Sequence, residues 1–374
     1  MTDDFRAAHA TAPAWRDAAA AILLELGDLT PQHQLGFLYV TDSFADALND
    51  IVVFMRQTTG VRQWVGTVGL GVVGTGKEYF DEPAMSVMVA PIADEAFRLF
   101  TDAEGDIGSV SQKHADWLAE ADTPLAVVHA DPRIADVTGR IEELAAATNG
   151  FLAGGLTASR SRFAQLAGEV DEGVVSGVML SLHQVPVQIG LTQGCSPIGP
   201  TRTITGAEEN VLFTIDDRPA LEVLKEDIGE VLARDLRRIG GYIFAALPVP
   251  GSDTADYLVR NLTGIDQESS AVAIGEMVET GDPIMFCRRD PDTAVEDLKR
   301  MLHDLKRRAG GGAIKGGLYF SCVARGPNQF GPDSAELGMI RDELGDFPLA
   351  GLFANGEISN DRLYGYTGVL ALFL

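Results

Sequence analysis

The fold of this chain is decided by residues 34–91, which read QLGFLYVTDSFADALNDIVVFMRQTTGVRQWVGTVGLGVVGTGKEYFDEPAMSVMVAP. The apolar run at 36–40 is rich in the β-branched and aromatic types that strands favour. Apolar residues at helical spacing follow over 48–55 and predict an amphipathic helix that ends at a glycine. A glycine-rich segment at 65–69 and an apolar run at 84–90 predict two further strands. The stretch therefore reads as strand, helix, strand, strand.

Two more windows, 125–182 and 317–374, repeat this order of events. Each has an opening strand, a polar turn, an amphipathic helix with a stop signal, a glycine-rich segment and a closing strand. A repeated unit of this size cannot bury its sheet alone, so we expect the units to pack on one another. The apolar helix positions are Leu48, Ile51, Val52 and Met55 in the first window, Val137, Ile141, Leu144 and Ala145 in the second, and Leu337, Ile340 and Leu344 in the third.

The stretch between the second and third windows has a different composition. A Gly/Pro loop at 194–200 precedes a predicted hairpin at 201–215 and a helix that starts near Pro219, with short strands after it. We predict two packed domains, an N-terminal one at 30–205 with two of the repeated units and a C-terminal one at 206–374 with the hairpin, the long helix and the third unit. The expected fold class is α/β, an α+β arrangement of mixed sheets.

Charge and composition exclude several classes of protein. The chain has 54 acidic and 29 basic residues, a net charge of −25, and its basic pairs fall in the last turns of predicted helices, where cations offset the helix dipole. Nucleic acid is therefore not expected as a partner. No run approaches the ~20 apolar residues of a membrane span, and no secretory signal precedes the helix predicted from Trp15 to Gly27. The first twelve residues carry no apolar pattern.

The chain has three cysteines, Cys195, Cys287 and Cys322. An odd number in so long a chain suggests no disulfide framework, and this favours a reducing, cytoplasmic location. The six histidines are dispersed, and no two are three or four residues apart, so no metal site is expected.

Two phosphate-binding motifs occur in the first glycine segment, and neither is in the required context. Residues 69–74 match the dinucleotide fingerprint GxGxxG, and residues 71–77 match the start of a P-loop. Both motifs need a helix at their end, whereas a polar connection and a strand follow here. Glu78 also takes the place of the Ser or Thr that would bind magnesium. We interpret the segment as strand and expect no nucleotide cofactor.

Strand ends and loops hold the remaining candidate residues. Cys195 lies in the Gly/Pro loop, and Cys322 ends a strand three residues before Arg325, whose charge would favour a thiolate. Both thiols could equally be buried hydrophobic groups. Glu357 follows the third glycine segment and could bind an amino group or accept from backbone amides. A further pattern, Asp333 followed by Glu336, predicts a capping box at the third helix.

Several short motifs in this order resemble the FIST family, over about residue 34 to the C-terminus. No single motif would suffice. They are GCSPIG at 194–199, TIT at 203–205, PAL at 219–221, YLVR at 257–260, GID at 264–266, FSCVARG at 320–326, PLAG at 348–351 and NGEI at 355–358. One departure is Thr67, which stands after Gly66 where similar proteins tend to have cysteine.

The resemblance implies a sensory module with N- and C-terminal FIST domains that binds a small ligand such as an amino acid. Arg325 would then face the ligand's carboxylate and Glu357 its amine, and output would pass to a separate signalling protein. Alternatives are a cysteine-dependent acyl-transfer or hydrolase enzyme and a ligand-free adaptor. The sequence sets no expectation for the oligomeric state. The candidate ligand-binding residues are Gly66, Gly154, Gly155, Cys195, Gly199, Cys322, Arg325, Asn355 and Glu357.

Overall fold

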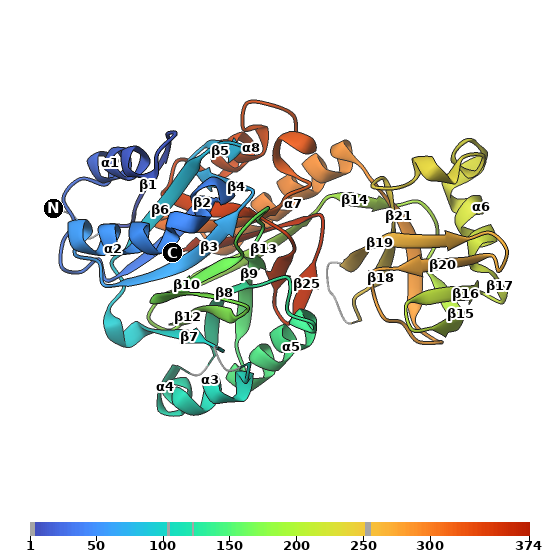
Figure 1. Cartoon of the computed structure of the whole chain (residues 1–374), viewed down its shortest axis with the longest axis horizontal. Coiled ribbons are helices and arrows are strands. Elements are labelled where there is room, and N and C mark those ends of the chain that lie inside the picture. Colours follow the sequence, from blue (N-terminus) through green and yellow to red (C-terminus); the bar gives the residue numbers. More distant parts are fainter. Residues whose placement is uncertain (1–3, 103–104, 122, 251–255) are drawn as a thin grey trace. The chain divides into compact units, whose positions relative to one another are not determined.

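The computed structural model describes residues 4–102, 105–121, 123–250 and 256–374. The chain forms two compact units (Figure 1). The large unit holds the chain up to residue 193 and again from 296 to the C-terminus, and the small unit holds 194–295. Helices and mixed sheets make up the chain, so the predicted α/β class in two domains is confirmed. None of the helices in the described residues is both long and apolar enough to cross a bilayer.

The large unit repeats one order of elements three times: strand, helix, strand, helix, strand, hairpin, strand. Repeats 1 and 2 are continuous, and repeat 3 is interrupted by the small unit after its first strand. Repeat 1 is β1 (Arg6–Thr11), α1 (Trp15–Leu26), β2 (Leu35–Thr41), α2 (Leu48–Thr59), β3 (Gln63–Gly69), β4 (Gly71–Gly74), β5 (Lys77–Phe80) and β6 (Ala84–Ala90). Repeat 2 is β7 (Phe97–Thr101), α3 (Ile107–Lys113), α4 (Ala115–Ala121), β8 (Pro124–Ala130), α5 (Val137–Thr148), β9 (Phe151–Leu156), β10 (Ala164–Ala167), β11 (Glu169–Glu172) and β12 (Val175–Ser181). Repeat 3 is β13 (Val187–Gln193), α7 (Pro291–Ala309), β22 (Gly316–Cys322), α8 (Ala335–Leu344), β23 (Leu349–Ala354), β24 (Glu357–Ser359), β25 (Arg362–Tyr364) and β26 (Thr367–Phe373).

Strand β1 corrects the expectation that the first twelve residues are unpatterned. It pairs antiparallel with β6 from Arg6 to Thr11, and Ala8 and Ala10 are buried beneath the helices. The segment has almost none of the β-branched or aromatic residues that favour strands. The segment is a strand because it pairs with β6, and the sequence pattern does not report that pairing.

The hairpin of each repeat pairs with the sheet of another repeat. Hairpin β4–β5 of repeat 1 joins β23 of repeat 3, β24–β25 of repeat 3 joins β9 of repeat 2, and β10–β11 of repeat 2 joins β3 of repeat 1. The exchange is cyclic, and it gives three six-stranded sheets. Their strand orders are β1-β6-β2-β3-β10-β11 for sheet 1, β25-β24-β9-β8-β12-β7 for sheet 2, and β13-β26-β22-β23-β4-β5 for sheet 3.

The inner faces of the three sheets share one apolar core, because strand residues alternate between faces. Equivalent residues of the three repeats meet at its centre: Tyr39, His129 and Phe320, with ring centroids 5.5–6.1 Å apart. The outer faces are covered by helices α1 and α2 on sheet 1, α3 to α5 on sheet 2, and α7 and α8 on sheet 3.

Two further sequence expectations concern local structure. No helix follows the GxGxxG match; β3 ends at Gly69 and β4 begins at Gly71, so the strand interpretation is confirmed. The capping box at the third helix was wrong. Asp333 and Ser334 both have positive φ, α8 starts at Ala335, and Ser334 makes no side-chain capping bond. Glu336 turns into the protein instead of back to the helix start.

The described part of the small unit is an antiparallel barrel packed against the helix α6. Strands β21, β15, β16, β20, β19 and β18 pair in that order, and β18 returns to β21, which closes the ring. The apolar side of α6 packs into the barrel's core. The elements are β14 (Cys195–Pro197), β15 (Arg202–Glu208), β16 (Val211–Ile215), β17 (Arg218–Pro219), α6 (Ala220–Ala233), β18 (Ile243–Pro248), β19 (Tyr257–Asp266), β20 (Ala271–Ile274) and β21 (Pro283–Arg289).

The compact units differ from the predicted domains at 30–205 and 206–374. The third repeat belongs to the same compact unit as the first two, and the second unit is the stretch of different composition by itself. Cyclic hairpin exchange is the reason, since sheet 3 needs strands from repeat 1 and sheet 2 needs strands from repeat 3.

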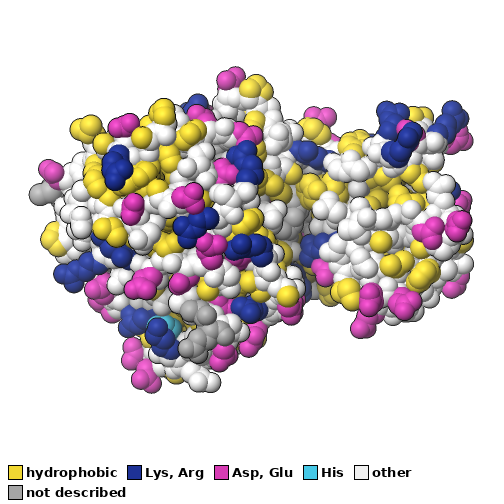
Figure 2. Space-filling model, viewed as in Figure 1, with side chains coloured by type: hydrophobic (Ala, Val, Ile, Leu, Met, Phe, Trp, Pro, Cys, Tyr) yellow, Lys and Arg dark blue, Asp and Glu magenta, His cyan; other side chains and the backbone are white. Residues whose placement is uncertain are grey.

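The surface carries charges of both signs. On the face that Figure 2 shows, basic side chains stand among the acidic ones over both units. Surface ion pairs of the described residues include Arg162 with Glu172 at 2.8 Å and Lys306 with Glu343 at 2.9 Å.

Candidate functional site

One register row across each sheet faces the centre of the large unit, and the three rows differ in polarity. Directly paired residues of neighbouring strands project from the same face of a sheet. The row of sheet 3 is apolar, whereas those of sheets 1 and 2 carry polar groups. They are His9, Ser86, Tyr39, Thr67 and Gln165 in sheet 1; Thr101, Ser176, His129, Gly155 and Glu357 in sheet 2; and Leu191, Val369, Phe320, Leu352 and Val72 in sheet 3.

Glu357 is the charged member of these rows and the centre of what we name the Glu357 cluster, formed with Cys322, Arg325, Glu336 and Thr367. The Glu357 carboxyl is fully buried. Its Oε2 accepts from the backbone N–H of Thr367 at 3.1 Å and from the hydroxyl at 2.8 Å. Glu357 therefore does accept from a backbone amide, and the Cys322 side chain also hydrogen-bonds its carboxyl. The Oε1 atom is buried and has no partner among the described residues.

Arg325 lies three residues after the end of β22 and is also fully buried. Its Nε and Nη2 donate to Glu336 Oε1 at 2.9 and 2.7 Å, and its guanidinium stacks over the Phe330 ring at 4.9 Å. Glu336 also accepts from the Tyr319 hydroxyl at 2.6 Å. Arg325 Nη1 has no partner within the part of the chain that the structure describes. The ion pair leaves one donor of Arg325 unused.

Burial shifts the acid–base behaviour of this cluster. It raises the pKa of Glu357 to about 8, although hydrogen bonds from Thr367 oppose the change. Glu78, on the exchanged strand β5, has its pKa raised to about 7 by burial and by the neighbouring Glu336 carboxylate. Titratable groups with shifted pKa values that gather at a strand end are a feature of functional sites.

Cys322 adjoins Glu357, but its environment disfavours the thiolate. Burial raises the pKa of the Cys322 thiol, and the Glu357 carboxylate raises it further, outweighing the Arg325 charge. Arg325 does favour the Cys322 thiolate, as expected, but burial and the Glu357 carboxylate together outweigh it. The physical reason is that burial penalises the charged form of the thiol, and it is the largest of these effects.

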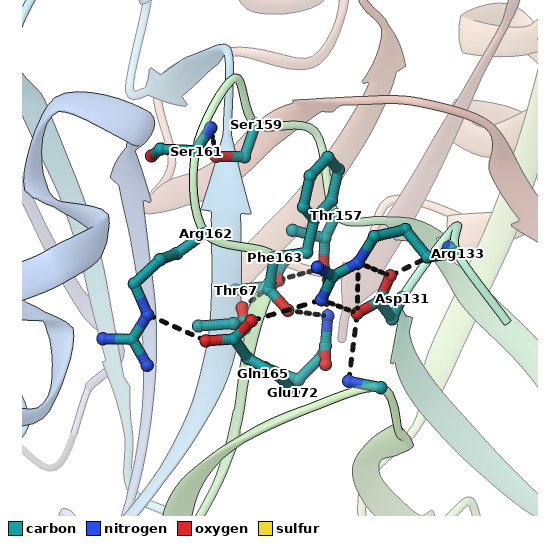
Figure 3. Close-up of polar contacts among 12 residues, drawn as sticks. Thr67, Asp131, Arg133, Thr157, Ser159, Ser161, Arg162, Phe163, Gln165 and Glu172 are labelled. Atoms are coloured by element: carbon teal, nitrogen blue, oxygen red, sulfur yellow. Dashed lines mark hydrogen bonds and ion pairs between the residues drawn. The ribbon is translucent and has the colours of Figure 1, made fainter.

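A second polar cluster occupies the equivalent place in sheet 1, where Gln165 stands in the position of Glu357 (Figure 3). Gln165 Nε2 donates to Thr157 Oγ1 at 2.7 Å, and Thr157 is 2.6 Å from Thr67 Oγ1. Gln165 Oε1, like Glu357 Oε1, has no partner among the described residues. Here the cluster is neutral, and the Gln165 amide nitrogen donates to one hydroxyl, that of Thr157, and to the Phe163 carbonyl oxygen.

Arg133 and Phe163 lie together above this neutral cluster, with the guanidinium 4.7 Å from the ring centroid. Arg133 holds the buried Asp131 through hydrogen bonds of 2.6–3.1 Å. Burial alone would raise the pKa of Asp131, but the Arg133 hydrogen bonds outweigh it and lower the pKa. The segment between β8 and α5 thus places a paired, half-exposed arginine against Phe163 of the 157–163 loop.

The predicted site residues fall into three groups. Cys322, Arg325 and Glu357 come together, and Gly155 pairs directly with Glu357 across β9 and β24. Asn355 is exposed, and its backbone N–H bonds Leu156. The other predicted residues do not join this cluster: Gly66 and Gly154 lie within tightly packed strand pairs of the large unit, and Cys195 and Gly199 belong to the small unit.

Sequence analysis missed the roles of Glu336, Glu78 and Thr367. A usable signal existed for Glu336, which is four residues before Ile340 and so shares the apolar face of its helix. An acid on a buried helix face needs a partner. Glu78 and Thr367 gave no such signal, because they reach the cluster only through the hairpin exchange and the strand register.

Family models and relatives match nearly the whole chain. Residues 34–218 match the FIST N domain, and residues 220–360 match the FIST C domain. An uncharacterized protein of Mycobacterium tuberculosis strain H37Rv is 31% identical over 377 residues, covering 96% of this chain and 95% of the relative. An uncharacterized protein of Mycobacterium bovis is 30% identical over 358 residues, covering 91% and 89% of the two chains.

Proposed function

The chain belongs to the FIST family, whose domains are sensory and signal-transduction modules, and on this premise we propose that it senses a small polar ligand, an amino acid or a related metabolite, at the Glu357 cluster. Its output would pass to a separate signalling protein. We place the protein in the cytoplasm, in keeping with its three free cysteines.

The unpaired Oε1 of Glu357 is the observation that supports this proposal most. A buried polar atom without a partner costs about 1–3 kcal/mol, so such atoms are rare and call for a partner. An amino group of a ligand would supply donors and a positive charge to this carboxyl. The Arg325 Nη1 atom could at the same time donate to the ligand's carboxylate.

The Arg325–Glu336 pair changes what Arg325 can contribute. A bidentate fork to a ligand carboxylate needs two guanidinium nitrogens, and Glu336 already holds two of the three. Arg325 would therefore give a single hydrogen bond, and the charge of Glu336 would weaken the attraction for an anion. We expect the amino group to contribute more to affinity than the carboxylate.

A thermal-shift screen against amino acids and their amides identifies the ligand, because ligand at ~100 times its Kd adds about 2.7 kcal/mol of stability. Calorimetric titration of the hit then compares the wild type with Glu357→Gln, and with Glu142→Gln on the exposed side of α5 as the control. We expect at least a tenfold loss of affinity for Glu357→Gln alone. Equal affinity in all three proteins would refute the site.

The same titration carries a second readout. A cationic ligand favours the charged form of Glu357, so binding at pH 7 should release protons from the wild type and far fewer from Glu357→Gln. Titrations in two buffers of different ionisation enthalpy measure that number. A ligand that binds without releasing protons would point to a neutral partner of Glu357.

A further inference from the structure

The large unit contains a cavity of about 590 Å³ away from the strand ends that form the Glu357 cluster. It lies where the last strands of the repeats end, with Pro91 after β6, Pro186 after β12 and Leu374 after β26 among its lining. The volume is within the range of small-molecule sites.

The inner wall of this cavity is part of the central apolar core. Five of the residues that line the cavity also belong to the core shared by the three sheets: Phe5, Ile92, Ala96, Val185 and Phe373. All five are at most 8% exposed. The wall therefore favours an apolar body, which gains about 25 cal/mol for each Å² removed from water.

Lys315 stands at the rim and is the only Lys or Arg among the lining residues. Its Nζ donates to the main-chain oxygen of Leu374, the last residue of the sequence, at 2.8 Å, and no side-chain carboxylate pairs with it among the described residues. Asp4 also lines the cavity, but no ion pair joins it to Lys315 within the described residues. A cation held in place at the edge of an apolar wall matches an anionic head on an apolar tail.

We propose that this cavity is a second ligand site, one that takes an amphipathic carboxylate with its alkyl or aryl body against the core and its head at Lys315. This site is independent of the Glu357 cluster and of the function proposed for it. Decanoate, below its aggregation concentration, is the probe, and decanol is its neutral counterpart.

Calorimetry of the full-length protein with both probes tests the site. Decanoate should bind one to one, and more tightly than decanol. Ala93→Trp, which places an indole at the lining, should weaken both probes at least tenfold, whereas Ala20→Trp on exposed α1 should not. Lys315→Gln should weaken decanoate several-fold and leave decanol unchanged, and the exposed Lys299→Gln should do neither.

A labelling experiment on the wild type keeps the proposal testable if Ala93→Trp fails to fold. A decanoate analogue with a photoreactive diazirine at its tail should label peptides that contain residues 91–96 or 184–186, and excess decanoate should suppress the labelling. Absence of saturable binding by either probe, or labelling confined to other peptides, would overturn the proposal.

Discussion

At the scale of single residues, three fully buried ionisable side chains of the large unit lie close together. Arg325 and Glu336 are both fully buried and paired at 2.7 Å, and Glu357 is buried beside them without a balancing cation in hydrogen-bond contact. Removing charges from water is costly, and only good geometry and added hydrogen bonds offset that cost. The cluster is therefore where single substitutions should have their largest electrostatic effects.

Removing one partner of the buried pair should destabilise the fold strongly. Arg325→Met leaves Glu336 buried without its cation, and we expect a loss of about 3–5 kcal/mol in the free energy of unfolding. Chemical denaturation measures it, with the half-exposed Arg341→Met as control. The double variant Arg325→Met, Glu336→Met should recover part of the loss. A double variant less stable than Arg325→Met would contradict this account.

The raised carboxyl pKa values set the direction of the pH dependence. Glu357 and Glu78 titrate near 8 and 7 in the folded protein and near the ordinary value of 4.5 when unfolded. Their contribution to stability is fully present below pH 4.5 and is lost as the pH rises through the folded values.

Glu357→Gln should accordingly flatten the decline of unfolding free energy between pH 5 and 8, by up to about 1.4 kcal/mol per pH unit. Urea denaturation at half-unit steps of pH measures the slope, with Glu142→Gln as the control. A slope that Glu357→Gln leaves unchanged would mean that the carboxyl is solvated in the folded state.

At the scale of elements, one glycine in each repeat sets the distance within a parallel strand pair. A Cβ placed on Gly66, Gly154 or Gly351 would lie 1.7–1.9 Å from a backbone carbonyl oxygen of the paired strand. These glycines are equivalent by register, so the requirement arises from the repeat rather than from a ligand. A structural role explains Gly66 and Gly154 without a binding role.

Alanine at these positions should therefore be costly. For Gly154→Ala we expect a loss of about 3 kcal/mol or more in unfolding free energy, or failure to fold, because backbone atoms must move apart. Gly338→Ala on α8 meets no atom within 4 Å and should stabilise by about 0.5–1 kcal/mol. Thermal unfolding compares the two, and a Gly154→Ala protein as stable as the wild type would show that the strands can separate freely.

At the scale of the whole molecule, the third repeat has the same order of elements as the other two, with one insertion between its first strand and its first helix. Repeats 1 and 2 join their first strand to the next helix through 12–14 and 102–106. Repeat 3 carries the barrel at the same point, between β13 and α7. The barrel has its own apolar core and closes its own ring of strands.

Excision of residues 194–290, with a four-residue Gly/Ser linker in their place, should leave a folded large unit. The linker length lies between the three and five residues that separate the same elements in repeats 1 and 2. Far-UV circular dichroism and a single cooperative thermal transition would support this expectation. A chain that is unfolded or aggregated with the linker, and also with one of eight residues, would mean that the large unit needs the barrel.

The sequence by itself determined the repeated units, because local periodicity reports which face of a helix or strand is buried. The helices at 48–59, 137–148 and 335–344 and the strand pairs around them follow from that pattern, and so does the family resemblance. It also placed Cys322, Arg325 and Glu357 on a strand end and the loop that follows a neighbouring strand.

Only the tertiary structure decided which strands pair between repeats. Hairpin exchange brings Glu78 from repeat 1 to the Glu357 cluster and binds the third repeat to the first two, and pairing with β6 makes β1 a strand. The ion pair between Arg325 and Glu336 also forms only in the folded chain, since no spacing rule in the sequence requires it. The physical reason is that partner choice is a contact between distant segments, whereas periodicity records only which side of a segment is buried.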